Sequence, residues 1–216
     1  MHVIWDMGGT LLDTYTSVDR MLAEQVRASG DEISVPEVTA LTRVSIAHAI
    51  ATLASRFGLD PEALDRAYSD LKASWEVKPA PLMPGARDVI DAVRSSGGLN
   101  LIVTHRDRAS ATTLIRQHDL PIDAMICAPD GHPRKPDPGM YFAILKVCNI
   151  RARDAISVGD REIDIVASQA AGVRAALLTG ETENRDLVPS LTSAEPDWTI
   201  SSLTELIDRG ILSSGR

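Results

Sequence analysis

Short apolar runs alternate with longer segments of helical spacing along most of the chain. The runs expected to form strands are residues 3–5, 99–104, 124–128, 155–159 and 175–179. Strands that alternate with helices favour right-handed crossovers and a parallel sheet. A short edge strand at 198–200 and a last helix at 203–208 follow a polar, loop-like stretch at 180–195. The pattern predicts an α/β fold with a Rossmann-like core of three layers.

The interval between the first two runs is far longer than one crossover needs, and most of it has helical spacing. Hydrophobic positions recur with this spacing over residues 18–26, 41–57 and 64–75, which predicts three helices. We expect these helices to form a cap domain at residues 14–81 that lies as a lid over the strand ends. Residues 1–13 and 82–216 would then form the α/β core.

Helix start signals are found at three positions of the chain. Asp60 with Pro61 and Asp137 with Pro138 each combine an N-cap with a first-turn proline, and Asp107 is a further N-cap. We therefore expect helices to begin at these three places.

Composition and charge restrict the classes of partner. A net charge of -8 argues against a nucleic-acid surface, which needs basic residues to replace counterions. No apolar run approaches the roughly 18 residues that span a membrane, and the first residues do not form a signal peptide. Cys127 and Cys148 lack partners at metal-ligand spacing, so both are expected to be reduced core residues. We expect a soluble cytoplasmic protein, monomeric or homodimeric, that binds neither nucleic acid nor membrane.

Polar residues cluster where the predicted strands end. The segments are residues 6–13 after the first strand, 104–107 after the second, 134–138 before the fourth and 159–164 after the fourth. Ligands of open parallel sheets bind outside the carboxyl ends of the strands. The sequence therefore predicts a ligand site built from these segments.

The four segments resemble the ordered motifs of the haloacid-dehalogenase-like superfamily. Asp6 with Gly9-Thr10-Leu11 is similar to the nucleophile motif, Thr104 to the second, Lys135 before Pro-x-Pro to the third, and Gly-Asp-x-x-x-Asp at 159–164 to the fourth. The resemblance spans roughly residues 3–180. The position of the helical insertion is similar to that of the cap in the phosphoglycolate-phosphatase-like branch.

The resemblance implies phosphoryl transfer to a carboxylate, with a small phosphorylated metabolite as substrate. Asp6 would attack the phosphoryl group and form an aspartyl-phosphate that water later hydrolyses. A Mg²⁺ ion would be held by Asp6, Asp160 and the main-chain carbonyl of Gly8, because this ion prefers oxygen ligands. Asp164, one helical turn after Asp160, would support the metal directly or through a water.

The remaining motif residues would hold the substrate. Thr104 and the main-chain amide of His105 would bind the transferring phosphate, and Lys135 would neutralise it and orient Asp6. Gly9 and Arg106 are further candidates for substrate binding. Considered without the other motif residues, Lys135 would be interpreted as an exposed lysine on the protein surface.

Gly8 departs from the phosphatase form of the first motif, Asp-x-Asp. The second carboxylate of that motif protonates the leaving group, and such assistance is typically worth about a hundred- to ten-thousandfold. The departure predicts an impaired phosphatase that is restricted to good leaving groups, slow on alkyl phosphates and faster on acyl or aryl phosphates. Two alternatives remain open at this point: a non-catalytic protein that binds or senses a phosphometabolite, and a haloacid hydrolase that is insensitive to chelators.

Overall fold

The computed structural model describes residues 1–180 and 194–213, so most of the stretch at 180–195 lies outside the described residues. The chain divides into two compact units, Met1–Leu12 with Leu82–Arg216, and Asp13–Pro81. This division lies within one residue of the predicted one. That the second unit acts as a cap stays a prediction.

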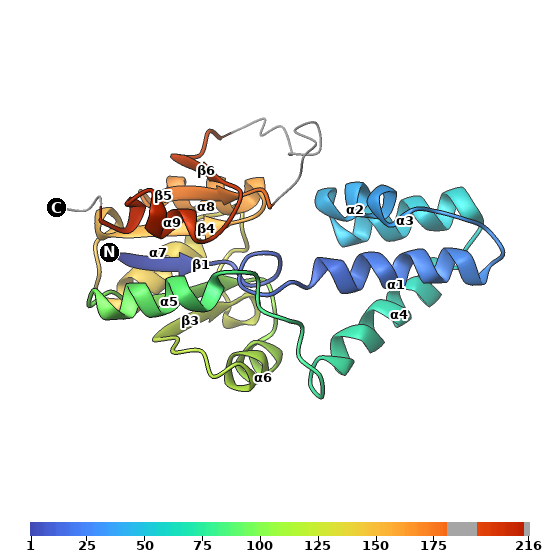
Figure 1. The fold of residues 1–216 in the computed structure, drawn as a ribbon, viewed down its shortest axis with the longest axis horizontal. Coiled ribbons are helices and arrows are strands. Elements are labelled where there is room, and N and C mark those ends of the chain that lie inside the picture. The colour runs from blue at the N-terminus through green and yellow to red at the C-terminus, as the bar shows by residue number, and fades with distance from the viewer. Residues whose placement is uncertain (181–193, 214–216) are drawn as a thin grey trace. The chain divides into compact units, whose positions relative to one another are not determined.

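The first unit is built on a parallel sheet, as the alternation of strands and helices predicts. Within the described ranges the sheet has six strands in the order β3-β2-β1-β4-β5-β6, and every neighbouring pair is parallel (Figure 1). The strands are β1 His2–Trp5, β2 Asn100–Thr104, β3 Ala124–Cys127, β4 Ala155–Gly159, β5 Arg174–Leu178 and β6 Trp198–Ile200. The order reverses beside β1, and open parallel sheets commonly bind their ligands at the carboxyl ends of the strands at such a point.

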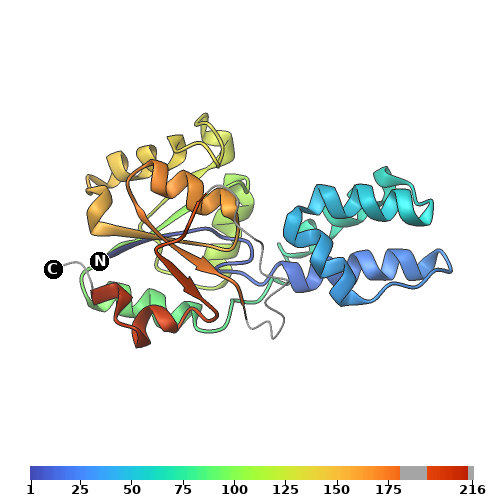
Figure 2. The same ribbon diagram turned by 90° about the horizontal axis from the view of Figure 1, so that it is seen from above.

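Helices cover both faces of the sheet, which confirms the three-layer α/β prediction. Figure 2 shows α7 and α8 on one face and α5 and α9 on the other. The helices of this unit are α5 Ala86–Ser95, α6 Arg108–Gln117, α7 Gly139–Cys148, α8 Glu162–Ala170 and α9 Glu205–Asp208. Short 3-10 turns occur at Ala128–Asp130, Ala152–Asp154 and Ile211–Ser213.

Residues of the central strands are buried on both faces, because helices cover each side. Ile4, Leu101 and Val103 pack against α7 and α8. On the other face the indole nitrogen of Trp5 donates to Asn100 Oδ1 at 3.1 Å, and Asn100 Nδ2 donates to the carbonyl of Ile90 at 3.0 Å. These polar side chains tie β1 to β2 and β2 to α5.

The second unit is helical, but it contains one helix more than the sequence pattern predicts. In residues 13–81, all of which the structure describes, the helices are α1 Tyr15–Ala28, α2 Val35–Val44, α3 Ile46–Phe57 and α4 Pro61–Ser74. The single helix predicted over 41–57 is wrong. Ser45 has an extended backbone, and its side chain accepts a hydrogen bond from the amide of His48 at 2.9 Å, so it ends α2 and caps α3.

The predicted helix starts differ in accuracy. Asp60 and Asp107 are N-caps whose carboxylates accept amide hydrogen bonds, as expected. The helix after Asp137 begins two residues later at Gly139, whose amide donates to Asp137 Oδ1 at 2.8 Å. Across residues 1–180 and 194–213, no helix has the length and apolar character needed to cross a membrane.

The two cysteines are free thiols, as expected. Cys127 is buried at the end of β3, whereas Cys148 is only half-buried at the end of α7. Burial raises the pKa of both thiols, so neither is activated as a nucleophile.

Candidate active site

Three carboxylates meet at the carboxyl end of the sheet. Asp6 directly follows β1, and its amide still donates to the carbonyl of Val158 in β4 at 2.9 Å. Asp160 directly follows β4, and Asp164 lies in the first turn of α8. Each offers one oxygen to a group whose members lie within 4.8 Å of one another. The structure therefore brings together the three acids that the sequence motifs named.

Lys135 is buried beside these acids, so the surface-cation interpretation of this residue is wrong. Its side chain is 0% exposed. Its ammonium donates to Asp6 Oδ1 at 2.6 Å, to Asp164 Oδ1 at 2.5 Å and to the carbonyl of Val103 at 3.0 Å. All three donors of the ammonium are used. Lys135 thereby holds the carboxylates of β1 and α8 at a fixed separation.

Burial and the repulsion between negative charges change the pKa values of the acids. Burial, followed by the negative charges of Asp6 and Asp164, raises the pKa of Asp160 to about 8. Burial also raises the pKa of Asp6, although Lys135 opposes this shift. For Lys135, burial lowers the pKa, but attraction to Asp164 and Asp6 raises it by more, so the group stays charged. Carboxylates crowded in this way favour a bound cation.

The donor set fits a hard divalent cation. All three side chains offer carboxylate oxygens, which Mg²⁺ and Ca²⁺ prefer, and no nitrogen or sulfur ligand belongs to the group. A bound divalent charge would also offset the repulsion between the acids. These residues can therefore hold a metal ion.

The loop after Asp6 is a tight turn that places different demands on its two glycines. Gly9 has φ 86°, and its amide donates to the carbonyl of Leu12 at 2.8 Å. A residue with a side chain would be strained at this φ. Gly8 is not among the glycines with positive φ, so the same argument does not apply to it. In the same loop the Thr10 hydroxyl donates to Asp160 Oδ1 at 3.2 Å, which links β1 to the end of β4.

Gly159 has a role that the sequence analysis did not identify. A Cβ at this position would lie 2.3 Å from Cβ of Asp164 and 2.7 Å from its Oδ2. Only glycine therefore lets Asp164 approach the end of β4. In the sequence, the only signal for this role is the glycine before Asp160. The reason that glycine is needed is that α8 folds back over the end of β4 and brings Asp164 close to it.

The segment after β2 provides the remaining predicted substrate residues. Thr104 is buried, and its hydroxyl accepts from the amide of Arg106 at 3.2 Å. The guanidinium of Arg106 donates to Ser110 Oγ at 3.1 Å. Burial, followed by the charges of Lys135, Arg134 and Arg161, lowers the pKa of His105 to about 4. Contact of these residues with a phosphate stays a prediction, as does that of Gly9.

Arg161 and Tyr141 also act on the site, although neither was predicted from the sequence. The positive charge of Arg161 opposes the rise in pKa that burial causes at both Asp6 and Asp160. Tyr141 in α7 shares a 2.8 Å hydrogen bond with Ser157 in β4 beneath the site. In the sequence, Arg161 is only a variable position of the fourth motif.

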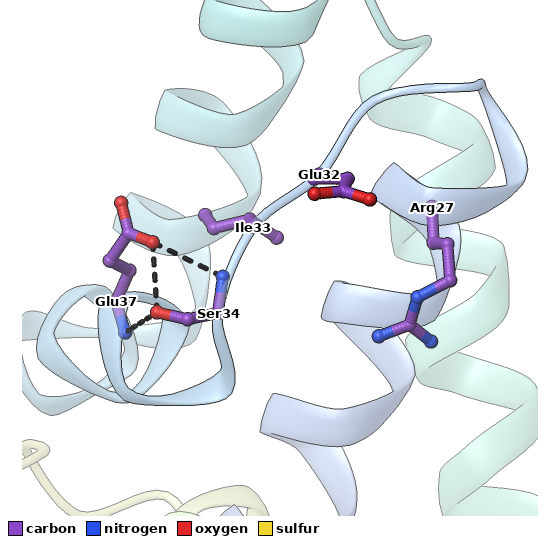
Figure 3. Close-up of a pocket in the computed structure, with 5 residues that line it drawn as sticks. All are labelled: Arg27, Glu32, Ile33, Ser34 and Glu37. Carbon is purple, nitrogen blue, oxygen red and sulfur yellow. Dashed lines mark hydrogen bonds between the residues drawn. The ribbon is translucent and has the colours of Figure 1, made fainter.

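A separate hollow lies wholly within the helical unit (Figure 3). It has a volume of about 510 Å³ and is lined by Arg27, Glu32, Ile33, Ser34 and Glu37. Ser34 and Glu37 are already joined by reciprocal hydrogen bonds that cap α2. Because its central polar groups serve the helix, we assign no ligand to this hollow.

The family profile described as haloacid dehalogenase-like hydrolase matches residues 3–178, which is most of the chain. The chain belongs to the haloacid dehalogenase-like hydrolase family. The match covers all four motifs, so membership and the prediction of a hydrolase are confirmed.

Named relatives agree with this family. Phosphoglycolate phosphatase 1 of Pseudomonas aeruginosa is 29% identical, over 95% of this chain and 78% of that protein. The crystal structure of a hydrolase from Streptococcus pneumoniae is 27% identical, with a TM-score of 0.67, over 82% of this chain and 92% of that one. A haloacid dehalogenase family hydrolase from Deinococcus radiodurans, with bound phosphate and sodium, has a TM-score of 0.79 at 19% identity, over 99% and 95% of the two chains. The last comparison supports the fold alone.

Proposed function

We propose that the protein is a magnesium-dependent phosphohydrolase that acts on a small phosphorylated metabolite through an aspartyl-phosphate. The observation that carries this proposal is the buried Lys135, bonded to Asp6 and Asp164, beside three carboxylates within 4.8 Å of one another. The naming of a 29% identical relative as a phosphoglycolate phosphatase supports the same reaction class.

The proposed reaction begins at Asp6. Lys135 holds Oδ1 of Asp6 and so fixes the rotation of the carboxylate, which leaves Oδ2 to attack the phosphorus. Asp6, Asp160 and the main-chain carbonyl of Gly8 would hold Mg²⁺, with Asp164 in support. The ion would supply charge neutralisation when a carboxylate meets a phosphoryl group.

Other residues would bind the phosphoryl oxygens. The Thr104 hydroxyl and the main-chain amide of His105 are the proposed contacts, with Gly9 and Arg106 at the edge of the site. Such fixed donors stabilise charge on the equatorial oxygens of the transition state. The charge of Lys135, whose three donors are bonded to protein oxygens, would neutralise the phosphate without a hydrogen bond to it. A lid role for residues 14–81, a cytoplasmic location and a monomeric or homodimeric state stay predictions from the sequence.

Turnover of an aryl phosphate is the direct test of this function. We expect purified protein to hydrolyse an aryl phosphate with Mg²⁺, to lose activity in EDTA and to regain it when Mg²⁺ is added back, because the crowded acids need a cation. Release of phosphate is the measurement. Tight binding of Mg²⁺ and phosphate without turnover would instead identify a phosphometabolite-binding protein, and halide release that persists in EDTA would identify a haloacid hydrolase.

Gly8 allows a test of the proposed restriction to good leaving groups. We expect Gly8→Asp to raise the rate on alkyl phosphates by about tenfold or more, because a carboxylate there can protonate the leaving alkoxide. Gly8 is not among the glycines with positive φ, so its φ alone does not require glycine. The ratio of alkyl to aryl kcat/KM is the measurement.

The aryl substrate is the internal control for Gly8→Asp, since an aryl leaving group gains little from a proton donor. An alkyl-to-aryl ratio that does not change would contradict the restriction. Gly9→Asp is a second control. Because Gly9 has φ 86°, an Asp there is strained, and we expect the rates on both substrates to fall together.

A further inference from the structure

We infer that the side chain of His105 is a substrate-contacting group that donates a hydrogen bond from Nε2 to an oxygen of the transferring phosphoryl group. The inference rests on the proposed function and adds a side-chain contact to it. It concerns binding only, and no bond other than the hydrogen bond forms or breaks.

The first observation is an unsatisfied polar atom. Nε2 of His105 is buried, and it has no hydrogen-bond partner among the residues that the structure describes. Buried polar atoms in native proteins are almost always paired, and an unpaired one weakens the fold. An atom left in this state beside a candidate active site lacks a partner that a bound ligand would supply.

The second observation is the position of His105 on the sheet. It follows Thr104 at the carboxyl end of β2, and β2 pairs with β1, the strand that presents Asp6. The carbonyl of Val103, two residues earlier, accepts from the same ammonium that binds Asp6. His105 therefore belongs to the edge of the sheet where the acids lie.

The third observation is the charge around the imidazole. The positive charges of Lys135, Arg134 and Arg161 all lower the pKa of His105. The first two residues precede α7, and Arg161 is the N-cap residue of α8. Asp164 is the acid that opposes them. The positive charges that act on the ring outnumber the negative ones, which favours an anion, so a phosphoryl oxygen matches these surroundings.

The charge state of His105 agrees with a donor role. Its pKa of about 4, lowered by burial and then by the same cations, keeps the ring neutral at pH 7. A neutral ring can carry its proton on Nε2 and donate without adding a fourth buried positive charge. Titration of His105 itself should therefore add no pH dependence to the contact between about pH 6 and 8.

Binding of inorganic phosphate to variants of His105 tests the inference. In the presence of Mg²⁺ we expect His105→Leu to raise the Kd for phosphate by about tenfold, the usual effect of losing a hydrogen bond to a charged group. His105→Gln keeps an amide donor near the position of Nε2 and should retain most of the affinity. His118→Leu, at the end of α6, is the matched control and should bind phosphate like the wild type.

The Tm of the ligand-free protein gives a second readout. His105→Leu removes the unpaired buried atom, so its Tm should rise by about 2–4 °C while phosphate binding weakens. A purely structural histidine would instead lower the Tm when replaced. Rates on aryl and alkyl phosphates should fall by the same factor, because the contact is to the transferred group.

Four results would overturn the inference. The first is an unchanged phosphate Kd in His105→Leu, and the second is no phosphate binding by the wild type. The third is an equal loss of affinity in the Gln and Leu variants. The fourth is a loss of rate confined to alkyl phosphates, which would place His105 at the leaving group. If the wild type binds phosphate but turns over no phosphate ester, the proposed function fails while the Kd values still decide the role of His105.

Discussion

Asp6→Asn should abolish phosphatase turnover, with a loss of at least about a thousandfold in kcat, and leave the protein folded. An amide does not attack phosphorus, so the aspartyl-phosphate cannot form. The amide oxygen can still accept the hydrogen bond that Lys135 donates to Asp6 Oδ1 at 2.6 Å. The measurement is phosphate release from an aryl phosphate in Mg²⁺, with circular dichroism to verify folding.

The control for this variant is Asp91→Asn, which makes the same chemical change on the exposed side of α5 and should keep full activity. Acid-stable capture of radioactive phosphate on the wild type, absent from Asp6→Asn, would support the intermediate. Turnover by Asp6→Asn within tenfold of the wild type would contradict the assignment of Asp6 as the nucleophile.

Lys135→Met should lower both stability and activity. The change removes the partner of two carboxylates whose side chains are 6% and 0% exposed, Asp6 and Asp164. Breaking a buried ion pair on one side typically costs about 3–5 kcal/mol, which corresponds to a fall in Tm of roughly 10 °C. Loss of the charge near the phosphoryl group should lower kcat by a further factor of about a hundred or more.

The stability loss in Lys135→Met should depend on pH. Burial raises the pKa of Asp6 above its ordinary 3.8, and the Lys135 ammonium opposes this rise. In Lys135→Met the opposing charge is gone, so the pKa of Asp6 rises further. A carboxyl with a raised pKa in the folded state binds more protons there than when unfolded, so stability falls as pH rises above about 4. The difference in Tm from the wild type should therefore be small at acidic pH and larger near pH 8.

Lys146→Met, on the exposed side of α7, is the matched control and should change neither Tm nor rate. Lys135→Arg keeps the charge but not the compact ammonium, so it should recover part of the stability and little of the activity. A Lys135→Met protein as stable as the wild type at pH 8 would show that the buried contacts contribute little.

The fold was predictable because its strands are buried on both faces and its helices have regular apolar spacing. The exceptions have physical reasons. Ser45 separates α2 from α3 although the apolar spacing continues past it, because a side-chain cap can end a helix within a periodic pattern. The helix α5 follows a proline and glycine-rich stretch, and the sequence analysis did not assign it.

The acids and lysine of the site were predictable because each occupies a fixed place in an ordered motif. What the sequence could not give is the environment of single atoms. The unpaired Nε2 of His105 and the close approach of Gly159 to Asp164 depend on how loops from three strands pack together. Arg161 occupies a variable motif position, so no pattern distinguished it from a surface arginine.

The junction between the helical unit and the sheet unit determines which insertions and exchanges the first unit can tolerate. Leu12 and Leu82 pair as an antiparallel bridge, and the amide of Met83 donates to the carbonyl of Leu11 at 2.9 Å. The chain thus leaves the first unit and returns to it at one paired position outside the sheet. We expect an exchange, lengthening or deletion between these residues to leave the pairing of β1 with β2 and β4 unchanged. Recombination at this junction would then change the helical unit while the three acids and Lys135 keep their places.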